Sequence, residues 1–206
     1  MDTLALRLAA AGGRIDDLPA SQLVAAGFTL LQRSAPLVRM LAGRRSALLL
    51  PPGPAAVVAL AASDGRGAVV LPLDRSPEEL AAHCAASDVG AVFTLASHRD
   101  QVPASLGVVL LDAIPRTAMV RTPEGREQMV DLGSHVGLTI EGETDLPGRD
   151  EEALLLPATS VLTLTHRALL DFDGLGVEID PSRSDAAIVT ALLIPLLAGR
   201  TLRVAS

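Results

Sequence analysis

Apolar residues follow two different repeats along the chain. Short continuous apolar runs alternate with longer segments in which apolar residues recur every three or four positions. Runs of the first kind are typical of buried strands, and segments of the second kind are typical of helices. The pattern predicts strands at Ser46–Leu50, Ala68–Leu73, Ala91–Thr94, Gly107–Leu111 and Thr201–Val204, and helices at Thr3–Ala11, Pro19–Leu41, Pro54–Ser63, Pro77–Ser87 and Arg183–Ala198. This alternation predicts a three-layer α/β fold with helices on both faces of a mostly parallel sheet.

Proline and capping residues refine two of these helices. Pro36 lies inside the segment 19–41, where it removes an amide donor and clashes with the preceding turn. We therefore expect that helix to be bent or split. Ser76 directly precedes Pro77, and Glu79 stands three residues after Ser76, which is the spacing of a capping box. The helix is therefore expected to begin at Pro77.

Two further segments predict β-hairpins. Thr117–Leu132 alternates around Pro123-Glu124-Gly125, a typical turn sequence. Leu154–Leu156 is a short apolar strand, and Val161–Thr165 alternates so that Leu162 and Leu164 share one face. Between these two strands, Pro157–Ser160 predicts a turn.

All of these elements are expected to form one α/β domain over 1–206. Its expected parts are N-terminal helices (1–45), a βαβαβ core (46–112), a hairpin followed by an acidic, solvated loop at Glu141–Glu152 (113–152), and a shortened hairpin, helix and last strand (153–206).

The second hairpin resembles a motif of a known superfamily. Ala153–Leu170 reads ALLLPATSVLTLTHRALL, which resembles the phosphate-loop hairpin of adenylate-forming enzymes, namely acyl-CoA synthetases, luciferases and peptide-synthetase adenylation domains. In that superfamily an apolar strand ends in Thr-Ser, a Gly/Thr/Ser-rich loop with Pro-Lys-Gly follows, and the next strand ends in Leu-Thr-His-Arg before a helix. Here Thr159–Ser160 runs directly into Val161, and that loop is absent.

The resemblance extends to the scaffold. The segment from Ser46 to Leu95 is similar to the superfamily's N-terminal strands and helices, including the Gly-Ala-Val-Val-x-Pro-Leu strand and the Pro-x-Glu-Glu-Leu helix. LLIPLLAGRTLRV near the end resembles its Leu-Pro-Leu-Leu-x-Gly-Ala-x-Val segment. Together the similar segments cover roughly 20–111 and 151–205, and they imply the fold of the N-terminal subdomain.

Composition narrows the possible functions. With 49% hydrophobic and 20% charged residues the chain is expected to be globular. A net charge of −7 argues against nucleic acid or an anionic membrane as a partner. All 17 basic residues are arginine, so no lysine is available for a phosphate loop. Three features predict a cytoplasmic protein. The chain has one cysteine, its N-terminus lacks the basic residues of a leader, and its longest apolar stretch, Ala186–Ala198, is too short for a bilayer.

The resemblance implies a remnant of a nucleotide site. Thr159 and Ser160 match the Thr-Ser that precedes the phosphate loop, although two turn residues that cap a shortened hairpin are the simpler interpretation. Thr165 ends the second strand and can cap a helix that begins at His166. His166 matches the histidine of Leu-Thr-His-Arg and is expected in the first helical turn, partly packed.

Other polar residues predict no catalytic or metal site. His83 and Cys84 are adjacent on a helix and diverge by about 100°, so they form no dyad, and Cys84 is expected in the core. His98 and His135 have no ligand spacing around them. The acidic residues Asp171, Asp173, Glu178 and Asp180 could bind a cation, but a solvated turn is the simpler interpretation.

These observations favour a non-catalytic relic of an adenylation domain that acts through protein contacts or oligomerisation, without cofactors. The alternative is an accessory part of an AMP-forming ligase that keeps an acyl or nucleotide pocket, uses ATP or AMP with Mg²⁺, and is completed by another chain. An unrelated binding module or hydrolase is a third possibility. Because related enzymes continue beyond these segments, a homodimer or protein partner is expected on the face formed by Leu154–Thr165 and Arg183–Ala198.

Overall fold

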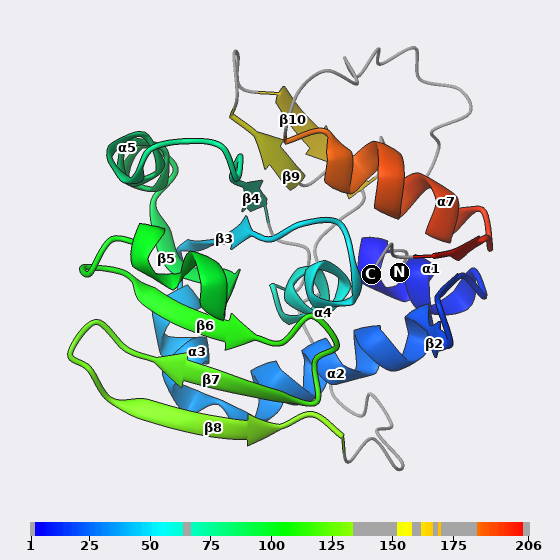
Figure 1. The fold of residues 1–206 in the computed structure, drawn as a ribbon, viewed down its shortest axis with the longest axis horizontal. Coiled ribbons are helices and arrows are strands. Elements are labelled where there is room, and N and C mark those ends of the chain that lie inside the picture. The colour runs from blue at the N-terminus through cyan, green and yellow to red at the C-terminus, as the bar shows by residue number, and fades with distance from the viewer. Residues whose placement is uncertain are drawn as a thin grey trace.

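The computed structural model describes residues 3–63, 67–133, 152–157, 162–166, 169 and 185–203. Its centre is an eight-stranded mixed sheet with the order β10-β9-β4-β3-β5-β6-β7-β8 (Figure 1). The five central strands from β9 to β6 run parallel, whereas β10 at one edge and β7 and β8 at the other run antiparallel to their neighbours. The strands are β3 (Arg45–Leu49), β4 (Ala68–Val70), β5 (Val89–Leu95), β6 (Gly107–Leu111), β7 (Thr117–Arg121), β8 (Glu127–Asp131), β9 (Glu152–Leu156) and β10 (Leu162–Thr165).

Helices cover both faces of this sheet, as the strand–helix alternation predicted. One face packs against a large core that includes α1, α2, α4 and the last helical segment, whereas α5 packs with β3, β4, β5 and β9 on the other face. The mostly parallel three-layer α/β fold is therefore confirmed. The helical segments are α1 (Leu4–Ala10), α2 (Ala20–Arg33), α3 (Ala35–Leu41), α4 (Pro54–Ala62), α5 (Pro77–Ala86), the 3₁₀-helix η1 (Ala96–Gln101), the π-helix η2 (Ile188–Leu193) and α7 (Ile194–Leu197).

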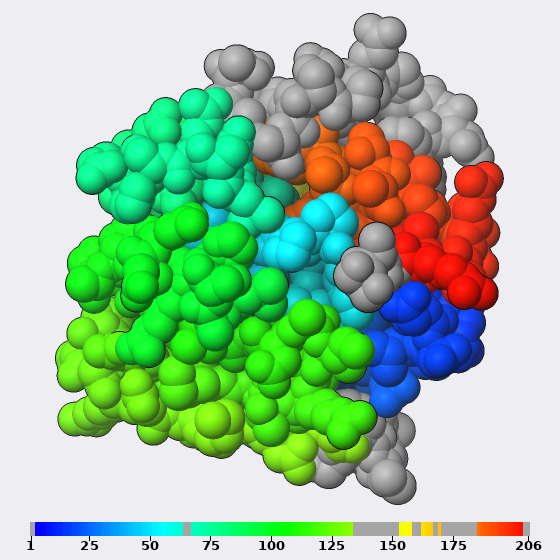
Figure 2. Space-filling model, in the orientation of Figure 1, coloured from blue at the N-terminus to red at the C-terminus, as the bar shows by residue number. Residues whose placement is uncertain are grey.

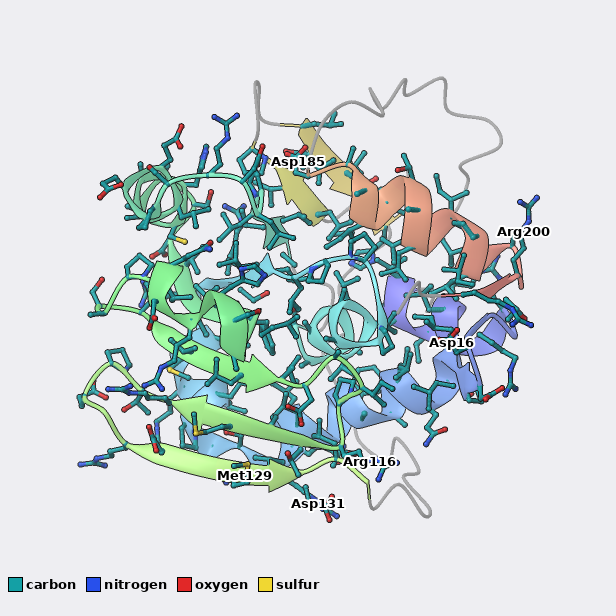
Figure 3. The ribbon with its side chains drawn as sticks, viewed as in Figure 1. Asp16, Arg116, Met129, Asp131, Asp185 and Arg200 are labelled. Atoms are coloured by element: carbon teal, nitrogen blue, oxygen red, sulfur yellow. The ribbon has the colours of Figure 1, made fainter. Side chains whose placement is uncertain are left out.

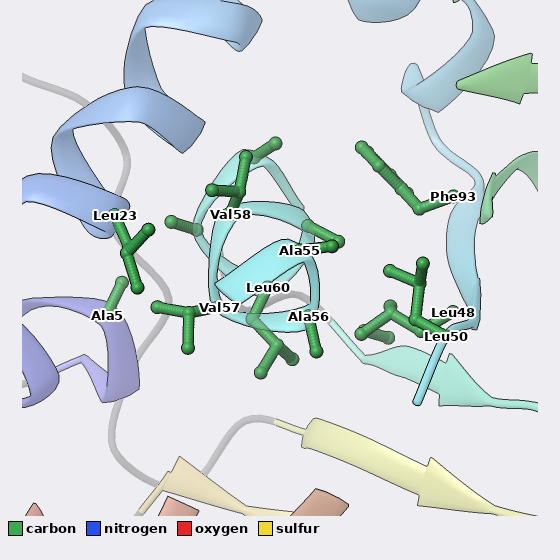
Figure 4. Close-up of a cluster of buried hydrophobic side chains, with 14 of the residues drawn as sticks. Ala5, Leu23, Leu48, Leu50, Ala55, Ala56, Val57, Val58, Leu60 and Phe93 are labelled. Carbon is green, nitrogen blue, oxygen red and sulfur yellow. The ribbon is translucent and has the colours of Figure 1, made fainter. Parts of the chain in front are cut away.

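Helix α4 is the centre of the larger core. All nine of its residues are buried, which its uniformly apolar sequence PAAVVALAA requires. Figure 4 shows α4 between two groups of side chains, with Leu23 of α2 on one side and Phe93 of β5 on the other. A helix that is apolar all round must be covered on every side, so α2 and the sheet have to pack closely on it.

The predicted break in the helix 19–41 is confirmed and lies at Ser34. The Ser34 hydroxyl accepts a hydrogen bond from the Leu37 amide (3.3 Å), so Ser34 caps α3. The same hydroxyl donates to Oε1 of Gln128 on β8 (3.1 Å), and Nε2 of Gln128 donates to the carbonyl of Arg33 (2.9 Å). The junction between α2 and α3 is thereby attached to the edge strand of the sheet.

The predicted capping box of α5 is also present. The Glu79 amide donates to the Ser76 hydroxyl (3.3 Å), and the Ser76 amide donates to the Glu79 carboxylate (3.0 Å). Arg75 adds a charged contact of 3.1 Å to the same carboxylate. The hydrogen bond from the Ser76 amide, assisted by Arg75, lowers the pKa of Glu79.

We expect the exposed Glu79 to make stability depend on pH in one direction. Because its pKa is lower in the folded state, its contribution is present above the unfolded pKa and disappears as the pH falls through the folded pKa. Glu79→Gln should therefore lower the urea midpoint slightly at pH 7, and the difference from the wild type should shrink between pH 5 and pH 3. Glu78→Gln, at an exposed position without this hydrogen bond, is the matched control. An unchanged difference across that pH range would contradict the prediction.

The expected helix at 183–198 is present but is only partly α-helical. Among the described residues it is a π-helix over Ile188–Leu193 and becomes an α-helix at Ile194. Pro195 cannot donate to the carbonyl of Ala191, and its ring would clash with that carbonyl in a regular α-helix, so a wider turn precedes it. Gly199, at φ +71°, ends the helix, and the Arg200 amide donates to the Pro195 carbonyl (2.9 Å).

The sequence pattern missed a second, three-stranded sheet. β1 (Arg14–Ile15) lies between β2 (Leu18–Pro19) and β11 (Thr201–Leu202). The expected strand at 201–204 is thus confirmed as β11, which pairs in parallel with β1. Strands of two residues have no recognisable periodicity, so only their contacts reveal them. None of the described helices is long and apolar enough to cross a membrane.

Candidate functional site

The β9–β10 hairpin stands where the sequence predicted a remnant of a phosphate site. Leu156 and Leu162 are directly paired, so five residues, Pro157 to Val161, connect the two strands. Their sequence PATSV contains neither glycine nor lysine. Thr159 and Ser160 themselves lie outside the described residues, so their expected role stays a prediction.

Thr165 is the last residue of β10 and is half-buried. The register of β9 and β10 shifts between Leu164 and Thr165, where the strand ends. The helical residue that follows is His166, so Thr165 stands at the position expected of an N-cap. The rest of the expected first turn falls largely outside the described residues.

His166 is completely buried and links two segments that are far apart in the sequence. Its Nδ1 accepts a hydrogen bond from the backbone amide of Leu4 at 3.0 Å, across 162 positions. Leu4 is the first residue of α1, where a helix has amides without intrahelical partners. The hydrogen bond to the imidazole therefore links the start of α1 to the end of the β9–β10 hairpin. The sequence placed His166 in a helical turn but gave no signal for this partner.

The other candidate residues are separate from the hairpin. Cys84 is 2% exposed, and burial raises the pKa of its thiol to about 11, so it is protonated and unreactive at neutral pH, as expected for a core cysteine. His98 lies in η1, with Nδ1 3.4 Å from Nε2 of Gln101. In the described part of the chain no three metal-binding side chains cluster. His135 and the acidic residues Asp171, Asp173, Glu178 and Asp180 lie outside it.

One cavity of about 250 Å³ lies between α2, α3, α4 and the start of β3. Ser46 and Ser63 line it, and the Ser46 hydroxyl donates to that of Ser63 at 2.7 Å. Both residues stand where β3 begins and α4 ends, so the cavity is at the amino ends of the parallel strands. Ligands of open α/β sheets bind beyond the carboxyl ends. We therefore do not assign it as the functional site.

In the described residues, most large apolar side chains of the expected interaction face are buried or partly buried. Leu154, Leu156 and Leu164 of the hairpin, and Leu192 and Leu196 of the last helix, are all buried. The reason is that these residues belong to the core that α1, α2 and α4 complete. In the described residues the large exposed hydrophobic side chains are instead Val38, Ile114 and Met129. The described part of the chain therefore gives no support for an apolar interface at this face, and the position of a partner surface stays a prediction.

Comparisons with known proteins agree on the architecture. No protein-family model matches the sequence, and no curated protein matches it. Among solved structures, apo MatB from Rhodopseudomonas palustris is 18% identical with a TM-score of 0.61, and it matches over 98% of this chain and 45% of that chain. A benzoate CoA ligase from Burkholderia xenovorans is 15% identical with a TM-score of 0.62, over 98% and 45%. The N-terminal domain of FACL13 from Mycobacterium tuberculosis is 14% identical with a TM-score of 0.63, over 98% and 57%.

The chain thus spans about half the length of the structures that it matches. Identities this low show a shared fold and carry no information on activity. The matches cover 98% of this chain, which includes its mostly parallel sheet and the β9–β10 hairpin. This protein has the fold of the N-terminal region of adenylate-forming enzymes.

Proposed function

We propose that this chain is a non-catalytic relative of the N-terminal region of adenylate-forming enzymes and acts through contacts with protein. The observation that carries the proposal is the β9–β10 connection. Leu156 pairs directly with Leu162, and the five residues between them contain no glycine and no lysine.

The chemistry of phosphate binding supports this proposal. A phosphate loop needs glycines so that successive amides can converge on the phosphate oxygens, and a cation to balance their charge. Here the connection is short, lysine is absent from the whole chain, and the nearest arginine in the sequence is Arg167, beyond the end of β10. The residues present therefore do not fit a triphosphate, and we derive no nucleotide chemistry from them.

One observation supports a second candidate function. Nearly the whole chain matches about half of each related structure. The second candidate is an accessory part of an adenylate-forming ligase, in which the chain keeps an acyl or nucleotide pocket that another chain completes.

The purified chain should fail to form an acyl-adenylate. We expect ATP–pyrophosphate exchange to stay at the level of the enzyme-free blank with aliphatic, aromatic and amino-acid carboxylates, with a benzoate-CoA ligase as the positive control. Robust exchange with any acid would overturn the proposal. Exchange that appears only after a second protein is added would favour the accessory function.

Calorimetry with Mg²⁺-ATP provides an independent measurement. We expect no binding heat, whereas a dissociation constant of about 1 μM, or about −8 kcal/mol, would contradict the proposal. The combined change of Thr159→Ala and Ser160→Ala would then show whether the Thr-Ser pair is responsible. Thr163→Ala, at an exposed position in β10, is the matched control.

A further inference from the structure

The outer face of β6, β7 and β8 carries a row of apolar side chains. Leu110, Met119 and Met129 are paired directly across the three strands, so their side chains share one face of the sheet. On the opposite face the alternating residues, among them Val120 and Val130, are buried in the main core. Met129 is 64% exposed, and methionine adapts easily to a packing partner.

Among the described helices, η1 contacts β6 beside this row, whereas α5 does not reach β7 or β8. Helix α5 contributes to a core with β3, β4, β5 and β9, and the residues of that core do not include the row. Figure 1 shows β7 and β8 open toward the viewer, with the green helical segment after β5 beside β6, and Figure 2 shows a broad surface over the same strands. Figure 3 places Met129 and Asp131 on the outermost strand. In the part of the chain that the structure describes, the outer face of β7 and β8 therefore has no helix packed on it.

Charged residues border the row on one side. Arg121 stands opposite Glu127 in the register of β7 and β8, and Nε of Arg121 is 3.9 Å from the Glu127 carboxylate. Both side chains are accessible, at 40% and 51% exposure. At the other end of the same two strands, Thr117 stands opposite Asp131.

We propose that a second copy of this chain packs on this face, sheet against sheet, about a two-fold axis that runs parallel to β7 and β8 and between them. Such an axis places β7 of one copy on β8 of the other. Met119 then meets Met129 of its partner, Arg121 meets Glu127, and Thr117 meets Asp131. Across this axis methionine meets methionine and arginine meets glutamate, so the face is complementary to a second copy of itself, as a two-fold interface requires. Two sheets commonly pack face to face with their strands aligned in this way.

The size of the face sets the strength of the contact. Three strands of five residues cover about 14 Å by 17 Å, or about 240 Å², from the usual strand spacing and rise. Stable interfaces bury about 800 Å² on each partner. The dimer should therefore be weak and reversible, and it should form only at high protein concentration. This inference deepens the proposed function, because it names the partner and the surface, but its test does not involve ATP.

Sedimentation equilibrium of the full chain tests the proposal through a charge exchange. The wild type should shift with concentration from the 21.2 kDa of one chain toward twice that mass. Arg121→Glu places two carboxylates together across the axis, and Glu127→Arg places two guanidinium groups together, so each variant alone should dimerise at least tenfold more weakly. An equimolar mixture of the two variants restores opposite charges at both contacts and should form a heterodimer.

Two controls separate this contact from general charge effects. Arg39→Glu on α3 and Glu78→Arg on α5 change the net charge equally at exposed positions away from the row, and each should dimerise like the wild type. Circular dichroism confirms that every variant is folded. A wild type that is monomeric at 500 μM, or a mixture that stays monomeric, would overturn the proposal. Failure here would leave the ATP–pyrophosphate result untouched, so the two proposals can fail separately.

Discussion

Replacing Gly27 with valine should prevent cooperative folding. Gly27 lies in α2 where this helix crosses the buried helix α4. A Cβ atom at this position would lie 2.5 Å from the carbonyl oxygen of Val58 and 2.6 Å from Cβ of Ala61. Backbone atoms of a wholly buried helix cannot move aside, because α4 is held between α2 and the sheet. Valine adds two further methyl groups to the same contact.

The alanine variant gives a measurable intermediate case. Gly27→Ala gains up to about 1 kcal/mol in helix propensity. Overpacking typically costs about 1–3 kcal/mol, and here the new Cβ atom would clash with backbone atoms of α4. We expect a net loss of about 1–2 kcal/mol in the free energy of unfolding by urea. Gln22→Ala, at an exposed position of the same helix, should change it by less than about 0.5 kcal/mol. A Gly27→Ala variant as stable as the wild type would show that α2 and α4 are less tightly packed than the structure indicates.

Replacing His166 with leucine should cost about 2–3 kcal/mol, because the buried Leu4 amide loses its acceptor without gaining access to water. The side-chain volume is roughly conserved, so the loss reports the hydrogen bond more than a cavity. Urea unfolding measures the total effect. Hydrogen exchange at the Leu4 amide identifies its origin, since the amide should exchange faster in the variant.

His166→Asn is the matched control for this contact. The asparagine Oδ1 is as far along the side chain as the histidine Nδ1 and can accept from the same amide. The smaller asparagine side chain leaves a cavity, so total stability should still fall, but the protection of the Leu4 amide should return toward the wild-type value. Equal exchange in the leucine variant and the wild type would show that His166 does not hold α1.

Local signals determined much of this fold. The alternation of strands and helices, the break near Pro36, the capping box of Ser76 and Glu79, and both hairpins depend on residues within a few positions of each other. Their physical causes, namely amide capping, proline geometry and side-chain periodicity, act within one element. The chemistry of the connection between β9 and β10 is also local, because it depends on the absence of glycine and lysine from a short segment.

Only the tertiary structure decided which surfaces are covered. The run GVVLL in β6 indicated a strand buried on both faces, yet Val108 and Leu110 are only partly buried, because α5 extends no further than β5. Conversely, we expected the hairpin and the last helix to expose an apolar face, but their large core residues pack with α1, α2 and α4. The bond from Leu4 to His166 likewise joins residues 162 positions apart. The sequence pattern around a residue indicates that its side chain prefers burial. Whether the side chain is buried depends on which distant element packs against it, and no local signal specifies that element.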